Sequence, residues 1–572
     1  MKPLDSPPPC ATIKRWEDAS ASLEAAFKDY MDMCFGLGID SLRGEPQHDL
    51  APRIDFTLSM THTRISHYLK ESSCVLARTR NKLASSLYNF PEEVLSQIFL
   101  DVVFDHNGSQ GSQIPSMRQD VRLIYHRLYS LIGVCSSWRD ILMERGIFWS
   151  VIPMVSNPSI KREGPFELCL TRAGGSRLHL AVDHQVATSS TDLGTVLANH
   201  RSRLRAINIC VDDGDDETME YVVSQLLKHI PHGSLSELSI QLTDSESSDM
   251  STELPEDSDY IMYRDSPQQA SFSRLVQSLT AFRLYGARFH WDTLSFSTRL
   301  VELRIERVVL GYDDMIASFL QTLSLATGLR DLKIIAISTF RKRSPTPLSP
   351  ITFPALQSLF IEDLYLNTLE HLLPMIAPGS HRLTLFLSSD SLEINVLEDE
   401  DTDDETEDDE TRLDGLCSLL EHTSIDTLMM TGEGGGGWLT GFRLAQLLRS
   451  MPTLKTLKMD GWCFDKDLCQ RLTRSKNITT SKHSLLSTLQ NLHLSSVEIC
   501  HSKSFCDMIV THSLRQIVLG GVFSSTIAGW EPLQVDSAIV TWIKRSMPDL
   551  DLRLTEQEYW LPEFYEDEWR LW

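Results

Sequence analysis

A short leucine-rich pattern, repeated along most of the chain, is the feature that most constrains how this sequence can fold. Each copy has the form Leu-x-x-[Leu/Ile/Phe]-x-[Leu/Ile/Met], and most copies follow the previous one after about 21 to 35 residues. Full copies begin at Leu204, Leu235, Leu279, Leu300, Leu329, Leu356, Leu454, Leu489 and Leu514, a variant begins at Ile425, and a partial copy begins at Leu383. One such match is weak evidence, whereas ten at quasi-regular spacing indicate a repeat architecture.

The spacing within each copy predicts a strand, and several copies are preceded by a helical pattern. The last two apolar positions of a copy are two residues apart, so they share one face of a strand. A helical stripe of Met315, Phe319 and Leu323 precedes the copy at Leu329, for example. A strand and a helix within about thirty-five residues cannot bury their apolar faces alone, so neighbouring units must stack.

These repeats resemble the leucine-rich-repeat solenoid, with one departure from its strict pattern. The Asn or Cys expected two residues after each strand is replaced by Asp212, Thr243, Ala287, Val308, Ile337, Leu364, Glu433, Trp462, Val497 and Val522. Apolar residues at many of these positions predict that packing replaces the usual buried asparagine ladder. We therefore expect an irregular leucine-rich-repeat solenoid over 165–555; the alternative is a non-repetitive α/β domain with leucine-rich strands.

A second informative stretch, 90–149, contains two apolar helical patterns. Pro91 suits a first helical position, and Glu92 and Glu93 complement the positive end of the helix dipole. An apolar stripe follows, made of Val94, Leu95, Ile98 and Phe99. A further stripe predicts another helix, with apolar positions at Leu131, Val134, Cys135, Trp138, Ile141 and Leu142.

This pair of patterns resembles the F-box. The matching positions are Phe90, Pro91, Glu93, Val94, Leu95, Ile98 and Phe99, then Leu131, Val134, Cys135, Trp138, Arg139 and Trp149. Phe90 stands where the family usually has Leu, and the segment 102–127 is longer than the family's short turn. The resemblance implies that these helices bind a Skp-family adaptor through Phe90, Pro91, Val94, Leu95, Ile98, Phe99, Leu131, Val134, Cys135 and Trp138. The plainer interpretation is two core helices of an ordinary helical domain.

The remaining segments are less specific. We expect residues 1–52 to be a variable N-terminal segment that contains a short amphipathic helix. Apolar residues that recur every seven positions predict a long leading helix over 53–88. Self-association is the alternative role of this helix. The run 398–410 is almost entirely acidic and predicts a disordered insertion. The tail 556–572 mixes acids with aromatic residues. These could cap the last repeat, which we favour, or bind a basic partner segment.

Composition excludes several classes of function. The net charge of −25 and the lack of a Lys/Arg cluster argue against general nucleic-acid binding. No apolar run approaches the ~20 residues of a membrane-spanning helix, and the N-terminus lacks the apolar core of a secretory signal. The eleven scattered cysteines suggest buried free thiols in a cytoplasmic or nuclear protein, with neither zinc nor disulfides.

The Gly-rich stretch 432–437 lacks the Gly-Lys-[Ser/Thr] of a phosphate-binding loop, and the histidines show no ligand spacing, so we expect neither a cofactor nor enzymatic activity.

The expected fold class is α/β, with an N-terminal all-helical F-box-like region (89–150) followed by an irregular leucine-rich-repeat solenoid. This order resembles the F-box/leucine-rich-repeat proteins of fungi. It implies a substrate-recruiting subunit of an SCF-type cullin–RING ubiquitin ligase. The alternative is a repeat scaffold for protein–protein interaction without ubiquitin chemistry.

Overall fold

A computed structural model describes residues 11–40, 49–84, 87, 90–105, 115–155, 164–183, 192–211, 216–243, 254–342, 349–397, 409–432, 437–473, 488–525, 529–555, 564, 569 and 571. The chain forms two compact units, residues 1–91 and 92–572. Their boundary falls after Pro91, so the helices of the F-box-like stretch belong to the same unit as the repeats. The expected division between 150 and 165 is therefore not the main one in the structure.

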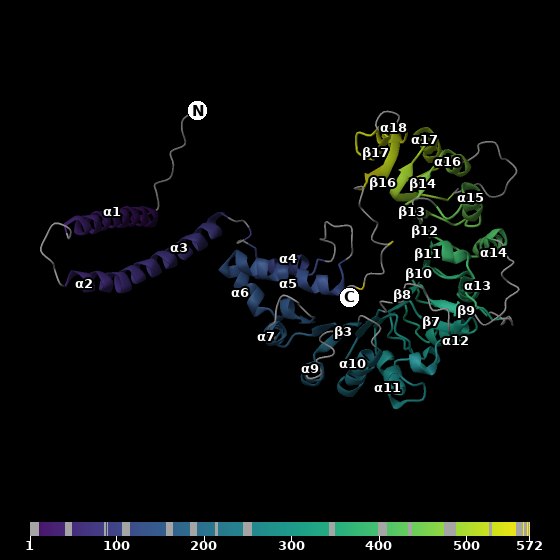
Figure 1. Cartoon of the computed structure of the whole chain (residues 1–572), viewed down its shortest axis with the longest axis horizontal. Helices are drawn as coiled ribbons and strands as arrows, with labels where there is room; N and C mark the ends of the chain where they lie inside the picture. Colours follow the sequence, from purple (N-terminus) through teal and green to yellow (C-terminus); the bar gives the residue numbers. More distant parts are fainter. Residues whose placement is uncertain are drawn as a thin grey trace. The chain divides into compact units, whose positions relative to one another are not determined.

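The first unit consists of helices (Figure 1). Its elements are α1 (Ala11–Asp40), α2 (Leu50–Phe56), the π-helical turn η1 (Thr57–His62) and α3 (Thr63–Ala84). The helix expected within 1–52 is thus thirty residues long rather than short. The long leading helix is present as the continuous run from Leu50 to Ala84, and none of its side chains is buried.

The second unit alternates helices with strands. Its helices are α4 (Glu92–Val103), α5 (Met117–Val134), α6 (Ser136–Glu144), α7 (Gly164–Arg172), α9 (Asp192–His200), α10 (Asp216–His229), α11 (Pro267–Val276), α12 (Met315–Leu323), α13 (Leu366–Met375), α14 (Asp409–Glu421), α15 (Gly441–Arg449), α16 (Lys466–Leu472), α17 (Ser502–Thr511) and α18 (Ala538–Ser546). Its main strands are β1 (Val151–Met154), β2 (Leu178–Asp183), β3 (Leu204–Val211), β4 (Glu237–Leu242), β5 (Ala281–Tyr285), β6 (Glu302–Glu306), β8 (Asp331–Ile335), β10 (Ser358–Glu362), β11 (Arg382–Leu387), β12 (Thr427–Thr431), β13 (Thr456–Asp460), β14 (Cys463–Phe464), β15 (Asn491–Ile499), β16 (Gln516–Ser525), β17 (Gly529–Pro532) and β18 (Asp551–Leu554).

These strands form one 16-stranded sheet that follows the order of the sequence from β1 to β16. Neighbouring strands are parallel, except that β17 runs antiparallel to β16. Strands β7 (Val309–Tyr312) and β9 (Ser338–Phe340) form a separate small sheet. Helices α9 to α17 lie along the outer side of the sheet and leave its inner face free of helices (Figure 1).

The leucine-rich copies account for this sheet. The last two apolar positions of each copy lie within one strand, and their side chains are buried on the helix side, as at Leu238 and Ile240 in β4. These positions align across the sheet, because Leu238 is paired with Phe282 and Leu303 with Leu332. The predicted solenoid of strand–helix units is therefore present as a mixed α/β fold with one long parallel sheet.

A left-handed residue directly after many strands explains how the asparagine ladder is replaced. Arg307, Ala336 and Asp363 directly follow β6, β8 and β10 with φ between 46° and 55°, and Gly286 follows β5 with φ of 70°. Ser496 has the same conformation within β15, where the pairing with β16 shifts register. This conformation turns the chain, and the next residue is then apolar and buried at Ala287, Val308, Ile337, Leu364, Trp462 and Val497. The prediction that packing replaces the ladder is confirmed at these positions.

Two local expectations need correction. The stripe from Leu131 to Leu142 is not one helix, because Cys135 is extended (φ −160°, ψ 167°) and separates α5 from α6. Much of the supposed long turn 102–127 is helical, since α5 begins at Met117 with a capping box formed by Ser116 and Gln119. Most of the acidic insertion 398–410 lies outside the described residues, and its last two residues begin α14.

Candidate functional site

Helix α4 has one apolar stripe that faces solvent. Val94, Ile98 and Val102 lie four residues apart and are 41%, 40% and 42% exposed. Residues spaced by four lie on the same side of a helix, so these three side chains form a continuous apolar strip. We call it the α4 strip. Phe90 and Pro91, which immediately precede α4, are exposed as well.

The opposite side of α4 belongs to the protein core. Leu95 and Phe99 are 6% and 2% exposed, and the ring of Phe99 packs against Trp138 with centroids 4.8 Å apart. Leu95, Phe99 and Trp138 therefore hold the helices together. Some of the residues predicted to bind the adaptor therefore pack in the core, and others face solvent.

The residues predicted on the second helix have mixed environments. Leu131 and Trp138 are half-buried, Cys135 is half-buried in the extended link between α5 and α6, and Val134 is 55% exposed. Of these, only Val134 presents a largely free apolar side chain.

Aromatic residues attach this helical region to the solenoid. Trp149 is buried beside Tyr125 and Tyr129, and its indole N–H donates a 2.9 Å hydrogen bond to the carbonyl of Leu142. The Tyr125 hydroxyl donates to the carbonyl of Val151 in the first strand of the sheet. Burial raises the pKa of Tyr125, so this hydroxyl stays protonated. Helices α4 to α6 thus share one apolar core with the repeats.

The inner sheet face is partly covered by residues from the end of the chain. Phe564 is buried against Phe386, with ring centroids 5.5 Å apart in an edge-to-face arrangement. Together these rings belong to a separate apolar cluster on the helix-free side of the sheet, formed by Ile335, Ala336, Phe360, Phe386, Met429 and Phe564. This cluster is distinct from the main core between the sheet and the helices.

A second contact of the same kind lies nearer the N-terminal strands. The Trp569 indole N–H donates a 2.6 Å hydrogen bond to Oδ1 of Asn208 in β3, and its ring lies 6.4 Å from Tyr285 in β5. The Trp569 carbonyl accepts a 2.7 Å bond from the N–H of Met117, while the N–H of Leu571 donates to Asp120. Residues 569 and 571 therefore join the sheet to α5.

We call Phe564, Trp569 and Leu571 the C-terminal anchors. The expectation that tail aromatics cap the last repeat is not met by these three residues, because they lie against β3, β5, the middle strands and α5. Sequence patterns did not predict this placement. The only available signal was the clustering of aromatic residues within an acidic segment.

Between the two contact sites, the inner sheet face contains a row of three cations with acids on both sides of it: Glu302 and Asp331 lie in the register row before it, and Glu306 and Glu362 in the row after it. Arg283, Arg304 and Lys333 are paired in register on the adjacent strands β5, β6 and β8. Arg283 donates two 2.7 Å hydrogen bonds to the carboxylate of Glu302. Arg304 pairs with Glu306 at 2.7 Å, and both side chains are only 1% exposed. Lys333 lies over the ring of Phe360.

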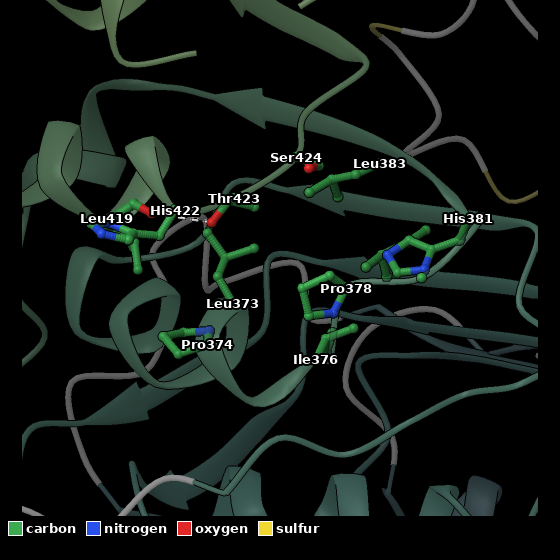
Figure 2. Close-up of a pocket in the computed structure, with 12 residues that line it drawn as sticks. Leu373, Pro374, Ile376, Pro378, His381, Leu383, Leu419, His422, Thr423 and Ser424 are labelled. Carbon is green, nitrogen blue, oxygen red and sulfur yellow. Dashed lines mark hydrogen bonds between the residues drawn. The ribbon is translucent and has the colours of Figure 1, made fainter. Parts of the chain in front are cut away.

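A cavity of about 520 Å³ is found elsewhere, where α13 and α14 meet the starts of β10 and β11. It is lined mainly by Leu, Ile and Pro side chains, and His381 and His422 lie on opposite sides of it (Figure 2). Burial lowers the pKa of His381. No acid is among the lining residues, and the cavity offers no paired acid and base.

The cysteines agree only in part with the expectation of buried thiols. Cys34 and Cys74 are exposed, whereas Cys169, Cys210, Cys417, Cys469 and Cys506 are buried. Cys463 and Cys500 from neighbouring repeats approach to 2.9 Å between their Sγ atoms. Within the described ranges, no cluster of three or more His, Cys, Asp or Glu could hold a metal ion, and no helix is long and apolar enough to cross a bilayer.

Comparisons with known proteins provide little beyond these observations. No protein-family model matches the chain, and no curated protein matches it. Among solved structures, the crystal structure of a TLR13–ssRNA13 complex aligns with 66% of this chain at 11% sequence identity, with a TM-score of 0.26. This chain spans about half of that chain's length, 52%. The mixed α/β solenoid assignment therefore rests on the strand order and register described above.

Proposed function

We propose that this chain recruits target proteins to an SCF-type cullin–RING ubiquitin ligase. In this proposal the α4 strip binds a Skp-family adaptor, and the solenoid holds the target. The chain itself carries out no chemistry. It raises the effective concentration of a target lysine near the ubiquitin carrier, while the other subunits supply catalysis.

The observation that carries the proposal is the division of the F-box-like residues between core and solvent. Leu95, Phe99 and Trp138 pack inward, while Val94 and Ile98 remain exposed on the same helix. An exposed apolar strip on a folded helix is typical of a protein-binding surface. The ordered similarity to the F-box supplies the identity of the expected partner.

A direct test is the capture of a purified Skp-family adaptor by the full-length chain. Val94→Ala combined with Ile98→Ala removes apolar contact area from the α4 strip without touching the core. We expect at least about a thirtyfold loss of affinity, since each interface anchor typically contributes ~2 kcal/mol or more. Thermal stability should change little, because both side chains are exposed.

The matched control lies on the same helix. Gln97 and Asp101 are exposed and bonded to each other at 3.0 Å, and they form a polar stripe that borders the α4 strip. Gln97→Ala with Asp101→Ala should bind the adaptor as the wild type does. Wild-type affinity in the folded Val94/Ile98 variant would refute the docking assignment.

A second candidate function is a protein-interaction scaffold without ubiquitin chemistry. It is favoured by the way α4 to α6 share a continuous core with the repeats, which gives these helices a structural role of their own. Under this candidate the wild-type chain does not bind the adaptor at all. The same capture experiment therefore separates the two functions.

A further inference from the structure

The helices of the first unit carry two apolar seams, each on one side of a long helix. The seam of α1 consists of Ile13, Trp16, Leu23, Phe27, Tyr30, Cys34 and Leu37, with Ser20 as its one polar position. The second seam consists of His62, Ile65, Leu69, Leu76 and Leu83, with Ser72 and Thr79 at the remaining positions. We call them the α1 seam and the α3 seam. In both, the positions are three and four residues apart in turn, which is the pattern of helices that wrap around one another.

The chain itself does not cover these seams. They meet at Tyr30 and His62, where the phenol oxygen lies 3.1 Å from the ring Nε2 and the ring centroids are 5.9 Å apart. This contact turns both seams toward the same side. Yet Leu23 is 51% exposed, and Leu69 and Leu76 are 44% and 45% exposed. The apolar side therefore remains open to solvent.

The two seams are similar in length and together are large enough for a stable interface. The α1 seam runs from Ile13 to Leu37 and the α3 seam from His62 to Leu83, so at ~1.5 Å per residue each is ~32–36 Å long. A helix is ~10 Å wide, so the two seams offer roughly 700 Å² per chain. Two copies would then bury roughly 1,400 Å², above the ~1,000 Å² that a specific interface needs.

Charge determines which helices fit each other. Helix α1 contains three Lys or Arg and six Asp or Glu, a net charge of −3, whereas Leu50–Ala84 contains six Lys or Arg and two Asp or Glu, a net charge of +4. Pairing α1 with α1, or α3 with α3, would bring together helices of like net charge. Pairing α1 with α3 brings opposite charges together.

The charges beside the seams also give a direction. Glu17 and Glu24 border the first half of the α1 seam, while Arg80 and Lys82 border the end of the α3 seam, and all four side chains are exposed. In an antiparallel pair of helices, the beginning of one lies beside the end of the other. Antiparallel pairing therefore places these acids next to these bases.

We propose that the first unit binds the first unit of a second copy of this chain, with the α1 seam of each copy packed antiparallel against the α3 seam of the other. Each α1 then lies between the α3 of its own chain and the α3 of the second copy, in a four-helix bundle. The pairing is symmetric, so every contact occurs twice. A second copy suits this side because it supplies both seams with matching length and opposite charge.

The first test measures the mass of the full-length chain by sedimentation across a wide range of concentrations. We expect the mass of two chains, falling to that of one chain on dilution. Leu69→Gln combined with Leu76→Gln puts polar groups into the α3 seam and should weaken association at least about thirtyfold. Helix content should be retained, because both leucines are exposed and Gln is a good helix former.

A matched control lies on the outer side of the same helix. Glu71 and Arg78 are exposed, seven residues apart like the two leucines, and lie outside the α3 seam. Glu71→Gln combined with Arg78→Gln introduces the same side chain twice and leaves the net charge unchanged. This variant should associate as the wild type does.

The second test exchanges charges between two variants of the full-length chain. One carries Glu17→Lys with Glu24→Lys, and the other carries Arg80→Glu with Lys82→Glu. Each variant alone should associate about tenfold more weakly than the wild type, because like charges then meet beside the seams. Mixing the two should restore association, since the new lysines of one variant face the new acids of the other.

Three results would overturn the proposal. A wild-type chain that stays monomeric at every concentration would show that the seams close within one chain or bind another protein. Association that survives the Leu69/Leu76 change would mean that the copies meet through a different surface. A mixture that associates no better than its components would exclude pairing of α1 with α3 between copies. The α4 strip lies outside the first unit, so adaptor capture by the same variants reports separately on the proposed function.

Discussion

The α4 strip and the inner sheet face are both apolar surfaces, yet only the second is covered by the chain itself. Val94, Ile98 and Val102 remain about two-fifths exposed, whereas Phe360, Phe386 and Met429 are buried with Phe564. The difference is one of access. The α4 strip is open to solvent, whereas the apolar part of the inner sheet face is reached only after Phe564 moves away.

The largest expected effect separates the two sides of α4. Phe99→Ala should lower the free energy of unfolding by ~3–5 kcal/mol, because Phe99 is 2% exposed and packs on Trp138. Val94→Ala on the same helix should change stability by less than ~0.5 kcal/mol. Urea denaturation measures both. Equal losses would mean that the α4 strip is part of the core, and the comparison above would fail.

An intermediate effect tests whether the inner sheet face is truly covered. Met429→Ala should lower the free energy of unfolding by ~2–4 kcal/mol, because its side chain is 1% exposed beside Phe564. In a Phe564→Ala background the same change should cost less, with a coupling of ~1 kcal/mol in a double-mutant cycle. Strictly additive effects would show that Phe564 does not cover Met429 in solution.

The smallest effect concerns the register shift within β15, one of the strands of the long sheet. Ser496 has φ of 52°, a left-handed conformation that costs most residues ~1 kcal/mol or more and glycine very little. Ser496→Gly should therefore raise the free energy of unfolding by ~0.5–1 kcal/mol, visible as a slightly higher melting temperature. A lower melting temperature would indicate that the Ser496 side chain contributes more than its backbone strain costs.

The leucine pattern predicted the strands that follow one another in the long sheet from β3 to β16, because a strand's inward positions depend mainly on local spacing. It did not predict the short strands β7, β9 and β14 or the last strands β17 and β18. The strand β2 was not predicted, since Arg177 occupies the leading position where other copies have an apolar residue, although Leu180 and Val182 are buried as in other repeats. Periodicity also placed Val94 and Leu95 in one stripe. It could not decide which of them faces solvent, because that depends on where α5 and α6 pack.

The position of the C-terminal anchors could not be predicted from spacing at all. Trp569 and Asn208 are 361 residues apart in sequence, and their contact depends on how the whole solenoid curves. The aromatic residues were visible in the sequence, but their partners on the sheet were polar or mixed positions without a pattern. Contacts of this kind depend on tertiary structure rather than on local propensity.

The long-range contacts of Phe564, Trp569 and Leu571 also bear on how the molecule folds. In a simple repeat array each unit contacts only its neighbours, so the ends can fray independently of the middle. Here the anchors link β3, the middle strands and α5, which connects units that are not adjacent. Closing so long a loop is entropically costly and therefore slow. We expect the repeats to stack first and the anchors to dock last, after which the array should melt as a more cooperative whole.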